Sequence, residues 1–340
     1  MIGQAACAFV LAAVAFSPTP QRNPSALPLQ QRPQTLREAR PMRSRAGPVT
    51  VPFEYFKRHI YVAVRVNGMP GFIFMLDSGA NRNILNLRTA RQLGMTPVDV
   101  TREKNVGLAD GRIDVAREEP VRAAVGPAAI ADAMAVVDLS AFERRFGHPT
   151  DGLLGAPFWQ QFVVKVDFKK RLLSLYPAER YAYHGSGIDV PLRGSRQGMV
   201  IPVTLGATKY DSQTTAMEVD TGSNVSLSLY RHCVHRLHLE QSVLHARTGE
   251  GYGVNGEFAS TQGLVDFLWI GNVEASDLPV DYFEPSQPIH PRCDVAGSIG
   301  NGILQNFQSV IFDVPHRRIV FELDRPAMQL RAMWNGHLLP

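Results

Sequence analysis

The chain repeats its own pattern, and this repetition limits most strongly what it can fold into. Each half holds one Asp-Ser/Thr-Gly motif at the end of a hydrophobic run, with Asp77 in the first half and Asp220 in the second, 143 residues apart. Four later landmarks recur in one order, at offsets of 145, 145, 146 and 146 residues: Gly155 and Gly300, Phe162 and Phe307, Asp167 and Asp313, Arg171 and Arg317. Such regular spacing indicates two copies of one structural unit.

The repeats divide the chain into four segments. Residues 1–16 contain a run of twelve uncharged, mostly apolar residues, which is too short for an ordinary membrane span and is typical of a signal peptide. Residues 17–50, rich in Pro, Gln and Arg, predict a disordered linker. The repeats then occupy 51–178 and 187–325. We therefore expect export to the periplasm or the cell exterior, with an N-terminal tether, a propeptide or an unstructured apolar start as open alternatives.

The positive charge belongs to the linker. Residues 17–50 hold six arginines and one glutamate, which gives this segment a net charge of +5. The whole chain has a net charge of +4, so residues 51–340 have a net charge of −1. Bases interleaved with aromatic residues are absent from the sequence, so we expect no nucleic-acid partner. The sequence also has no phosphate-binding glycine loop, nucleophile elbow or dinucleotide fingerprint. We expect no cofactor.

The hydrophobic patterns are mainly those of strands. Short runs rich in β-branched and aromatic residues predict strands, and two stretches predict helices. The predicted strands are Tyr61–Val66, Gly71–Leu76, Val163–Phe168, Arg171–Tyr176, Val310–Asp313 and Arg317–Leu323, and the predicted helices are Leu87–Leu93 and Leu229–Leu239. The fold class expected is all-β.

These motifs together resemble the aspartic peptidase superfamily. Each copy has an Asp-Ser/Thr-Gly loop and a later hydrophobic-Gly element, and the Asp-Gly-Leu-Leu-Gly sequence at 151–155, followed by Phe162 and Asp167, is similar to the retropepsin-like peptidases of bacteria. The resemblance implies two closed-barrel lobes related by a pseudo-two-fold axis, with a cleft between them. It also implies a polypeptide substrate, no metal, and a monomer in which one chain supplies both halves.

Asp77 and Asp220 are the candidate catalytic pair. Two carboxylates held close together cannot both ionise easily, so they share one proton, as in the aspartic proteases generally. The ionised partner then acts as a general base on water, and the protonated partner acts as a general acid. Which aspartate holds the proton is open at this point.

The residues that follow each aspartate are expected to support the loops. Gly79 and Gly222 allow a tight turn, and their amides can donate to the carboxylates. The resemblance implies that the hydroxyls of Ser78 and Thr221 grip the partner loop.

The two loops also differ. Ala80 has no side-chain donor where the second loop has Ser223. Glu218 precedes Asp220 by two residues and points the same way by strand alternation. An exposed residue at a sheet edge is our favoured interpretation of Glu218, and an extra acid near the cleft is the alternative.

Two glycine-containing segments are candidate flaps over the cleft. Asp110-Gly111 is a hairpin-type dipeptide in the first repeat, with Gly107 nearby. In the second repeat, Tyr252 and Gly253 lie in the segment from 249 to 256. An ordinary exposed hairpin is the alternative for both.

The remaining polar residues suggest structural roles. Four histidines surround Cys233, at 232, 235, 238 and 245, but their spacing fits no metal-ligand set and favours a solvated helix face. Cys233 and Cys293 either form a disulfide or stay as two thiols. Asp167 and Asp313 are expected to be turn residues.

Three other functions stay open alongside an active peptidase. The same fold could bind a peptide without cleaving it. Two chains could pair their loops in a homodimer. The aspartates could also be ordinary turn residues of an exported structural domain.

Overall fold

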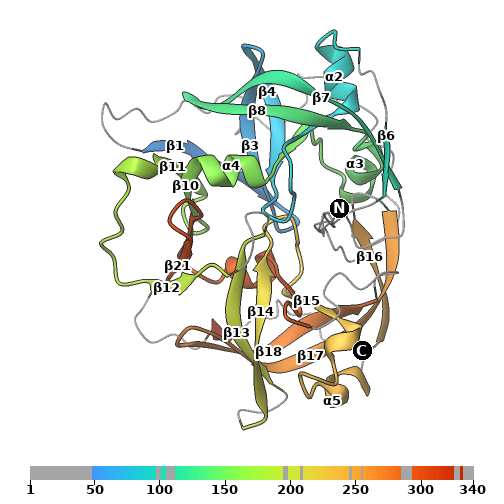
Figure 1. Ribbon diagram of the computed structural model, residues 1–340, viewed down its shortest axis with the longest axis vertical. Helices are drawn as coiled ribbons and strands as arrows, with labels where there is room; N and C mark the ends of the chain where they lie inside the picture. Colours follow the sequence, from blue (N-terminus) through green and yellow to red (C-terminus); the bar gives the residue numbers. More distant parts are fainter. Residues whose placement is uncertain are drawn as a thin grey trace, which may run out of the picture.

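The computed structural model describes residues 48–96, 101–104, 112–193, 198–206, 210–244, 247–253, 256–284, 293–324 and 330–331. The described chain forms two β-rich lobes joined by a further sheet, with the first repeat in the upper lobe of Figure 1 and the second in the lower lobe. The predicted signal-like segment and linker end at Thr50, and all but residues 48–50 of them lie outside the described part. Among the described residues, no helix has the length and apolarity needed to cross a membrane.

The first lobe is a closed barrel of six strands. Each strand pairs with the next, and the pairing of β3 with β7 closes the ring. In cyclic order the strands are β3 (His59–Val66), β4 (Met69–Leu76), β9 (Gly152–Leu154), β5 (Ile84–Asn86), β8 (Ala128–Val137) and β7 (Arg112–Val125). Two further strands extend the sheet, β2 (Glu54–Phe56) beside β3 and β6 (Thr101–Lys104) beside β7.

The second lobe repeats this barrel strand for strand. The pairing of β17 with β18 closes the ring here. In cyclic order the strands are β13 (Val200–Gly206), β14 (Ser212–Val219), β19 (Gly297–Ile299), β15 (Leu227–Tyr230), β18 (Val273–Phe283) and β17 (Gly256–Ile270). The added strands are β16 (Arg247–Gly253) beside β17 and β22 (Leu330–Arg331) beside β18. The duplicated sequence therefore folds as a duplicated barrel.

A six-stranded sheet made by both repeats joins the lobes. Its order is β1 (Val49–Pro52), β11 (Leu172–Pro177), β10 (Phe162–Asp167), β20 (Ser309–Asp313), β21 (Arg318–Glu322) and β12 (Ile188–Pro191). The two repeats meet where β10 pairs antiparallel with β20, with Val166 opposite Val310. This pairing relates the halves by a pseudo-two-fold axis.

The symmetry extends to single turns. Arg171 and Arg317 occupy the last position of equivalent hairpin turns and have positive φ values of 56° and 58°. Each carbonyl accepts a backbone N–H from its own lobe, Phe53 to Arg171 at 3.0 Å and Leu192 to Arg317 at 2.9 Å. An arginine with a positive φ thus accepts an equivalent backbone hydrogen bond in each repeat, which confirms that these two landmarks are equivalent.

Alternating residues of the strands build the core. Apolar side chains fill both barrels and the space behind the joining sheet as one cluster, with Trp159 and Phe312 in contact at 4.6 Å between ring centroids where the lobes meet. The helices are short: α2 (Leu87–Gln92), α3 (Ser140–Phe146), α4 (Ala156–Gln161), α5 (Glu240–Leu244), α6 (Asn301–Leu304), and the 3₁₀ turns η2 (Ala178–Arg180) and η3 (Arg231–Cys233). The six predicted strands and the helix at Leu87–Leu93 are confirmed.

The helix predicted over Leu229–Leu239 is wrong. Leu229 and Tyr230 belong to β15, where the Tyr230 N–H donates to the Ala296 carbonyl at 2.9 Å. The following residues form η3 and turns, and His238 has a φ of 54°. Strand pairing and this left-handed residue therefore exclude the helix predicted from the sequence.

The solvated helix face predicted for the histidines is consequently wrong as well. His235 contacts Glu240 and His238 contacts Asp211, each at 2.7 Å. Both pairs involve exposed side chains, and the two histidines lie on turns, so solvent screens these contacts and they add little to stability.

Cys233 and Cys293 form a disulfide, which decides between the two sequence alternatives. Their Cα atoms are 5.6 Å apart, and both residues are buried. The bond ties η3, which follows β15, to the segment that leads into β19.

Candidate active site

The two aspartate loops leave equivalent strands. Strands β4 and β14 each end one residue before the aspartate. The backbone then bonds to the neighbouring parallel strand in each lobe, from Asp77 N–H to the Leu154 carbonyl at 3.0 Å and from Asp220 N–H to the Ile299 carbonyl at 2.9 Å. Each aspartate is therefore held by its own barrel before any contact between the lobes.

Hydroxyl groups then lock one loop to the other. The Ser78 N–H donates to Oγ1 of Thr221 at 3.0 Å, and the Thr221 N–H donates to Oγ of Ser78 at 2.9 Å. Each hydroxyl in turn donates to a carbonyl of the opposite lobe, Ser78 to Val219 at 2.7 Å and Thr221 to Leu76 at 3.1 Å. These four reciprocal bonds are the grip that the resemblance implied.

Backbone amides orient the two carboxylates. Oδ1 of Asp77 accepts the N–H groups of Gly79 at 3.1 Å and Ala80 at 3.0 Å. Oδ1 of Asp220 accepts the N–H of Gly222 at 2.9 Å. Both predicted glycines thus contact the carboxylates as expected, and the first loop adds a second direct donor, the backbone amide of Ala80.

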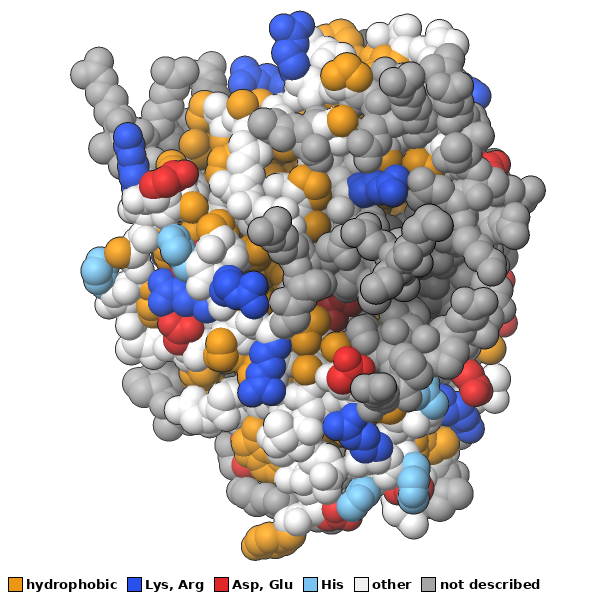
Figure 2. Space-filling view, viewed as in Figure 1, with side chains coloured by type: hydrophobic (Ala, Val, Ile, Leu, Met, Phe, Trp, Pro, Cys, Tyr) orange, Lys and Arg blue, Asp and Glu red, His pale blue; other side chains and the backbone are white. Residues whose placement is uncertain are grey.

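The second loop lies directly against the first carboxylate. A Cβ atom added to Gly222 would come within 2.4 Å of Oδ1 of Asp77, so only glycine fits this position without displacement. Asp77 and Asp220 are 2% and 1% exposed. Figure 2 shows acidic atoms recessed in the middle of the face, between the lobes. The structure brings together all six residues predicted for the pair and its supporting loops.

Burial raises the pKa of both carboxyls. For Asp77 the loss of hydration raises the pKa to about 7, against the lowering effect of its two amide donors. For Asp220 burial also comes first, and the negative charges of Asp77 and Glu218 raise its pKa further, well above its ordinary value. Since the two groups face each other, the pair holds a proton at higher pH than an isolated carboxylate would.

Glu218 is not the exposed edge residue that we favoured from the sequence. It is 8% exposed, and burial together with the charge of Asp77 raises its pKa to about 8. The exposed interpretation was wrong because β14 is an inner strand of the barrel, between β13 and β19, rather than an edge. Glu218 is a third carboxyl beside the pair.

Ser223 does not supply the extra donor that its sequence position suggested. Its Oγ is buried without a hydrogen-bond partner among the described residues. The two carboxylates are nevertheless unequal, because Ala80 donates through its backbone and because Glu218 has the apolar Met75 as its counterpart.

Asn301 is a site residue that the sequence analysis missed. Its Nδ2 donates to the carbonyl of Thr221 at 2.6 Å and to the carbonyl of Arg58 at 2.7 Å, and so connects the second loop to the first lobe. Asn301 directly follows Gly300, while the first copy has Ala156 at the equivalent place. This single difference between the copies was the available signal.

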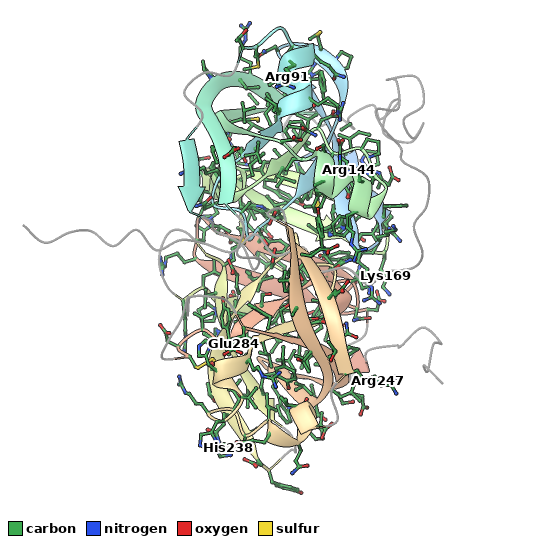
Figure 3. All side chains as sticks on the ribbon, turned by 90° about the vertical axis from the view of Figure 1, so that its right-hand side faces the viewer. Arg91, Arg144, Lys169, His238, Arg247 and Glu284 are labelled. Atoms are coloured by element: carbon green, nitrogen blue, oxygen red, sulfur yellow. A yellow bond between two sulfur atoms is a disulfide. The ribbon has the colours of Figure 1, made fainter. Side chains whose placement is uncertain are left out.

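Tyr252 and Gly253 lie at the end of a hairpin that reaches from the second lobe to the first. Strands β16 and β17 pair as far as Gly253 and Gly256. Tyr252 is buried in an apolar cluster of the first lobe, where its ring centroid lies 6.3 Å from that of Phe146 and 5.7 Å from the guanidinium of Arg145. In Figure 3 this hairpin extends from Arg247 toward the upper lobe. The candidate flap residues of the first repeat lie outside the described residues: Gly107, Asp110 and Gly111.

One group of side chains in the described part of the chain has spacing that would suit a metal ion. It consists of His232, Cys233 and Cys293, with ligand atoms within 4.8 Å of one another. Both sulfur atoms belong to the disulfide, so no thiolate is present to bind a metal.

Comparison with known proteins agrees with this geometry. A search of curated proteins finds no match. A family model described as aspartyl protease matches the chain twice, over residues 62–158 and 202–304, and the two matches cover more than half of the chain. Each match contains one aspartate loop, its barrel strands and the later glycine. The chain therefore belongs to the aspartyl protease family and carries two retropepsin-like repeats in a single polypeptide.

Proposed function

We propose that the protein is an aspartic endopeptidase that hydrolyses peptide bonds with a water held between Asp77 and Asp220. The observation that carries the proposal is the reciprocal bonding of Ser78 and Thr221, which fixes one buried carboxyl from each lobe at a common place. A pair of turn aspartates would not require the lobes to interlock around it.

We propose a separate role for each aspartate. Backbone amides lower the pKa of both carboxyls, but the negative charges of Asp77 and Glu218 raise the pKa of Asp220 further, so Asp220 keeps the proton and Asp77 carries the negative charge. Asp77 takes a proton from water as the water oxygen bonds to the peptide carbonyl carbon, and Asp220 gives its proton to the carbonyl oxygen. When the C–N bond breaks, the leaving nitrogen takes the proton from Asp77, and Asp220 regains one from the gem-diol.

The surrounding structure suits an extended polypeptide. The hairpin of β16 and β17 spans the lobes beside the site, and an extended substrate would add strand-like hydrogen bonds to it. We propose that the protein acts as a monomer, because β10 and β20 join the two halves within one chain. We also propose that it is exported, since the Cys233–Cys293 disulfide is of a kind that persists in oxidising compartments.

Cleavage by the full chain tests the proposal. The substrate is an unfolded protein or a peptide library, and the pH runs from about 3 to about 8 to bracket raised carboxyl pKa values. Asp77→Asn and Asp220→Asn should each lower kcat by about 10³-fold or more with folding intact. The exposed Asp266→Asn serves as the charge-matched control and should keep the wild-type rate. If the folded wild type binds peptides without cleaving them, the protein is a peptide-binding module and not a peptidase.

A further inference from the structure

The outer wall of the second barrel is polar beside the aspartate pair. Glu218 lies between Met217 and Val219, whose side chains fill the apolar core. Because side chains alternate along a strand, Glu218 points out of the barrel on the side of Asp220. The charge of Asp77 raises the pKa of Glu218, and the charge of Glu218 raises that of Asp220, so the three carboxyls interact electrostatically.

A row of polar residues continues from Glu218 across the wall. Residues that pair directly in neighbouring strands put their side chains on one face of a sheet. Four such residues lie side by side, one on each of β14, β19, β15 and β18: Glu218, Ser298, Ser228 and Asp281. These four residues are only 1% to 8% exposed to solvent, so all of them are buried. We call these four residues the polar row.

The first lobe has an apolar row at the equivalent place. Its members are Met75, Leu153, Ile84 and Ala135, paired across β4, β9, β5 and β8. All four belong to the apolar cluster that also takes Tyr252 from the β16 hairpin. The apolar row therefore has a partner within the molecule.

The polar row holds polar atoms without partners. Oε1 of Glu218 and Oγ of Ser228 are buried and accept or donate no hydrogen bond among the residues described. Asp281 accepts from Nε2 of Gln262 at 3.1 Å, and burial raises its pKa to about 6. In the described part of the structure, no ion pair joins Glu218 or Asp281 to a lysine, arginine or histidine. Two buried acids and a hydroxyl without a partner therefore form an acceptor-rich cluster with which no described lysine, arginine or histidine pairs.

We propose that the polar row binds the side chain of a substrate lysine or arginine next to the scissile bond, so that the enzyme selects basic residues on the second-lobe side of its cleft. This inference rests on the proposed peptidase function. Buried charges in proteins are paired, and a bound cation would pair with Glu218 where a neutral side chain would leave the acid without a partner. Neighbouring strands are about 4.8 Å apart, so a long basic side chain lying across the wall reaches from Glu218 past Ser298 toward Ser228.

Peptide cleavage by the full chain tests the inference. Matched peptides carry lysine, arginine, glutamine or norleucine at each position around the bond, and kcat/KM is measured for each. The wild type should prefer lysine or arginine over norleucine by at least about tenfold at one position. Glu218→Met, which introduces the residue found at the equivalent place in the first lobe, should reverse this preference. Glu218→Gln keeps the shape of the side chain and should abolish the preference. It provides the test if the methionine variant does not fold. Asp266→Asn should retain it.

The outcomes separate this inference from the proposed function. Cleavage without a basic preference, or a preference unchanged in both Glu218 variants, would overturn the role of the polar row and leave the peptidase intact. If the wild type cleaves nothing, the proposed function fails, and binding of the same peptides is measured by calorimetry instead. Tighter binding of the lysine peptide that disappears in Glu218→Gln would then support the row, and equal binding of all peptides would reject it.

Discussion

The two lobes share one backbone and differ in the wall that flanks the catalytic pair. Their strands, aspartate loops and hairpin turns correspond one to one, down to the positive φ of Arg171 and Arg317. The wall is apolar around Met75 and polar around Glu218. The catalytic geometry therefore depends on main-chain and hydroxyl bonds that both copies share, whereas the side chains of the two walls differ without disturbing it.

The disulfide belongs to the second lobe, and breaking it should produce the largest stability difference between the lobes. The bond closes a loop of 60 residues, for which chain entropy predicts about 4 kcal/mol of stabilisation. Hydrogen exchange after mild reduction should therefore rise in strands β15 and β19 much more than in β5 and β9. Cys233→Ser should reproduce the effect without reductant, and equal exchange in both lobes would contradict it.

Gly222→Ala tests how closely the second loop approaches the first carboxylate. The added methyl would lie 2.4 Å from Oδ1 of Asp77, which two amide donors hold in place, so one of the loops must move. We expect a loss in kcat of about 100-fold, or about 3 kcal/mol in the activation barrier. Gly68→Ala is the control, because Gly68 has a positive φ of 84° but nothing within 4 Å of an added Cβ, so this change should lower stability only.

The pH dependence of stability tests the buried state of Glu218. Its pKa is raised from 4.5 to about 8, so the folded chain binds this proton more tightly than the unfolded chain. The stabilisation is complete below about pH 4.5 and is lost as the pH rises toward 8. Glu218→Gln should remove about 5 kcal/mol of the decline in unfolding free energy over this range, since each pKa unit corresponds to about 1.4 kcal/mol. Denaturant melts would refute this if the decline persisted unchanged, and the exposed Asp138→Asn provides the comparison.

The reciprocal hydroxyl bonds should contribute equally from the two lobes. Ser78→Ala and Thr221→Val each leave a buried N–H and a buried carbonyl without a partner, so each should lower the unfolding free energy by about 1–2 kcal/mol. Thr204→Val removes a surface hydroxyl and should change the free energy little. A large effect in one lobe alone would show that the grip is one-sided.

The sequence predicts the symmetric features of the site well. The Asp-Ser/Thr-Gly motifs, the strands that precede them and the later glycines are short-range patterns, and each occurs twice, so each copy supports the other. The exchange of bonds between Ser78 and Thr221 followed from the resemblance.

The features that belong to one copy were harder to predict. The alternation of side chains along a strand predicts the face of β14 on which Glu218 lies. The burial of Glu218, however, depends on the neighbouring strands β13 and β19. The segment from Leu229 to Leu239 was predicted as a helix, yet the pairing of β15 and the left-handed His238 decide its structure. The partner of Cys233 lies 60 residues away and was set by the fold rather than by local sequence.

A double-mutant cycle tests the central claim most directly, namely that each lobe supplies one half of a single catalytic unit. The measurement is kcat/KM of the wild type, Asp77→Asn, Asp220→Asn and the double variant on one peptide. Residues that act as one unit give non-additive losses. If the two aspartates form one catalytic unit, the double variant is no less active than either single variant. Losses that multiply in the double variant would mean that the two aspartates act independently, and would contradict the shared site.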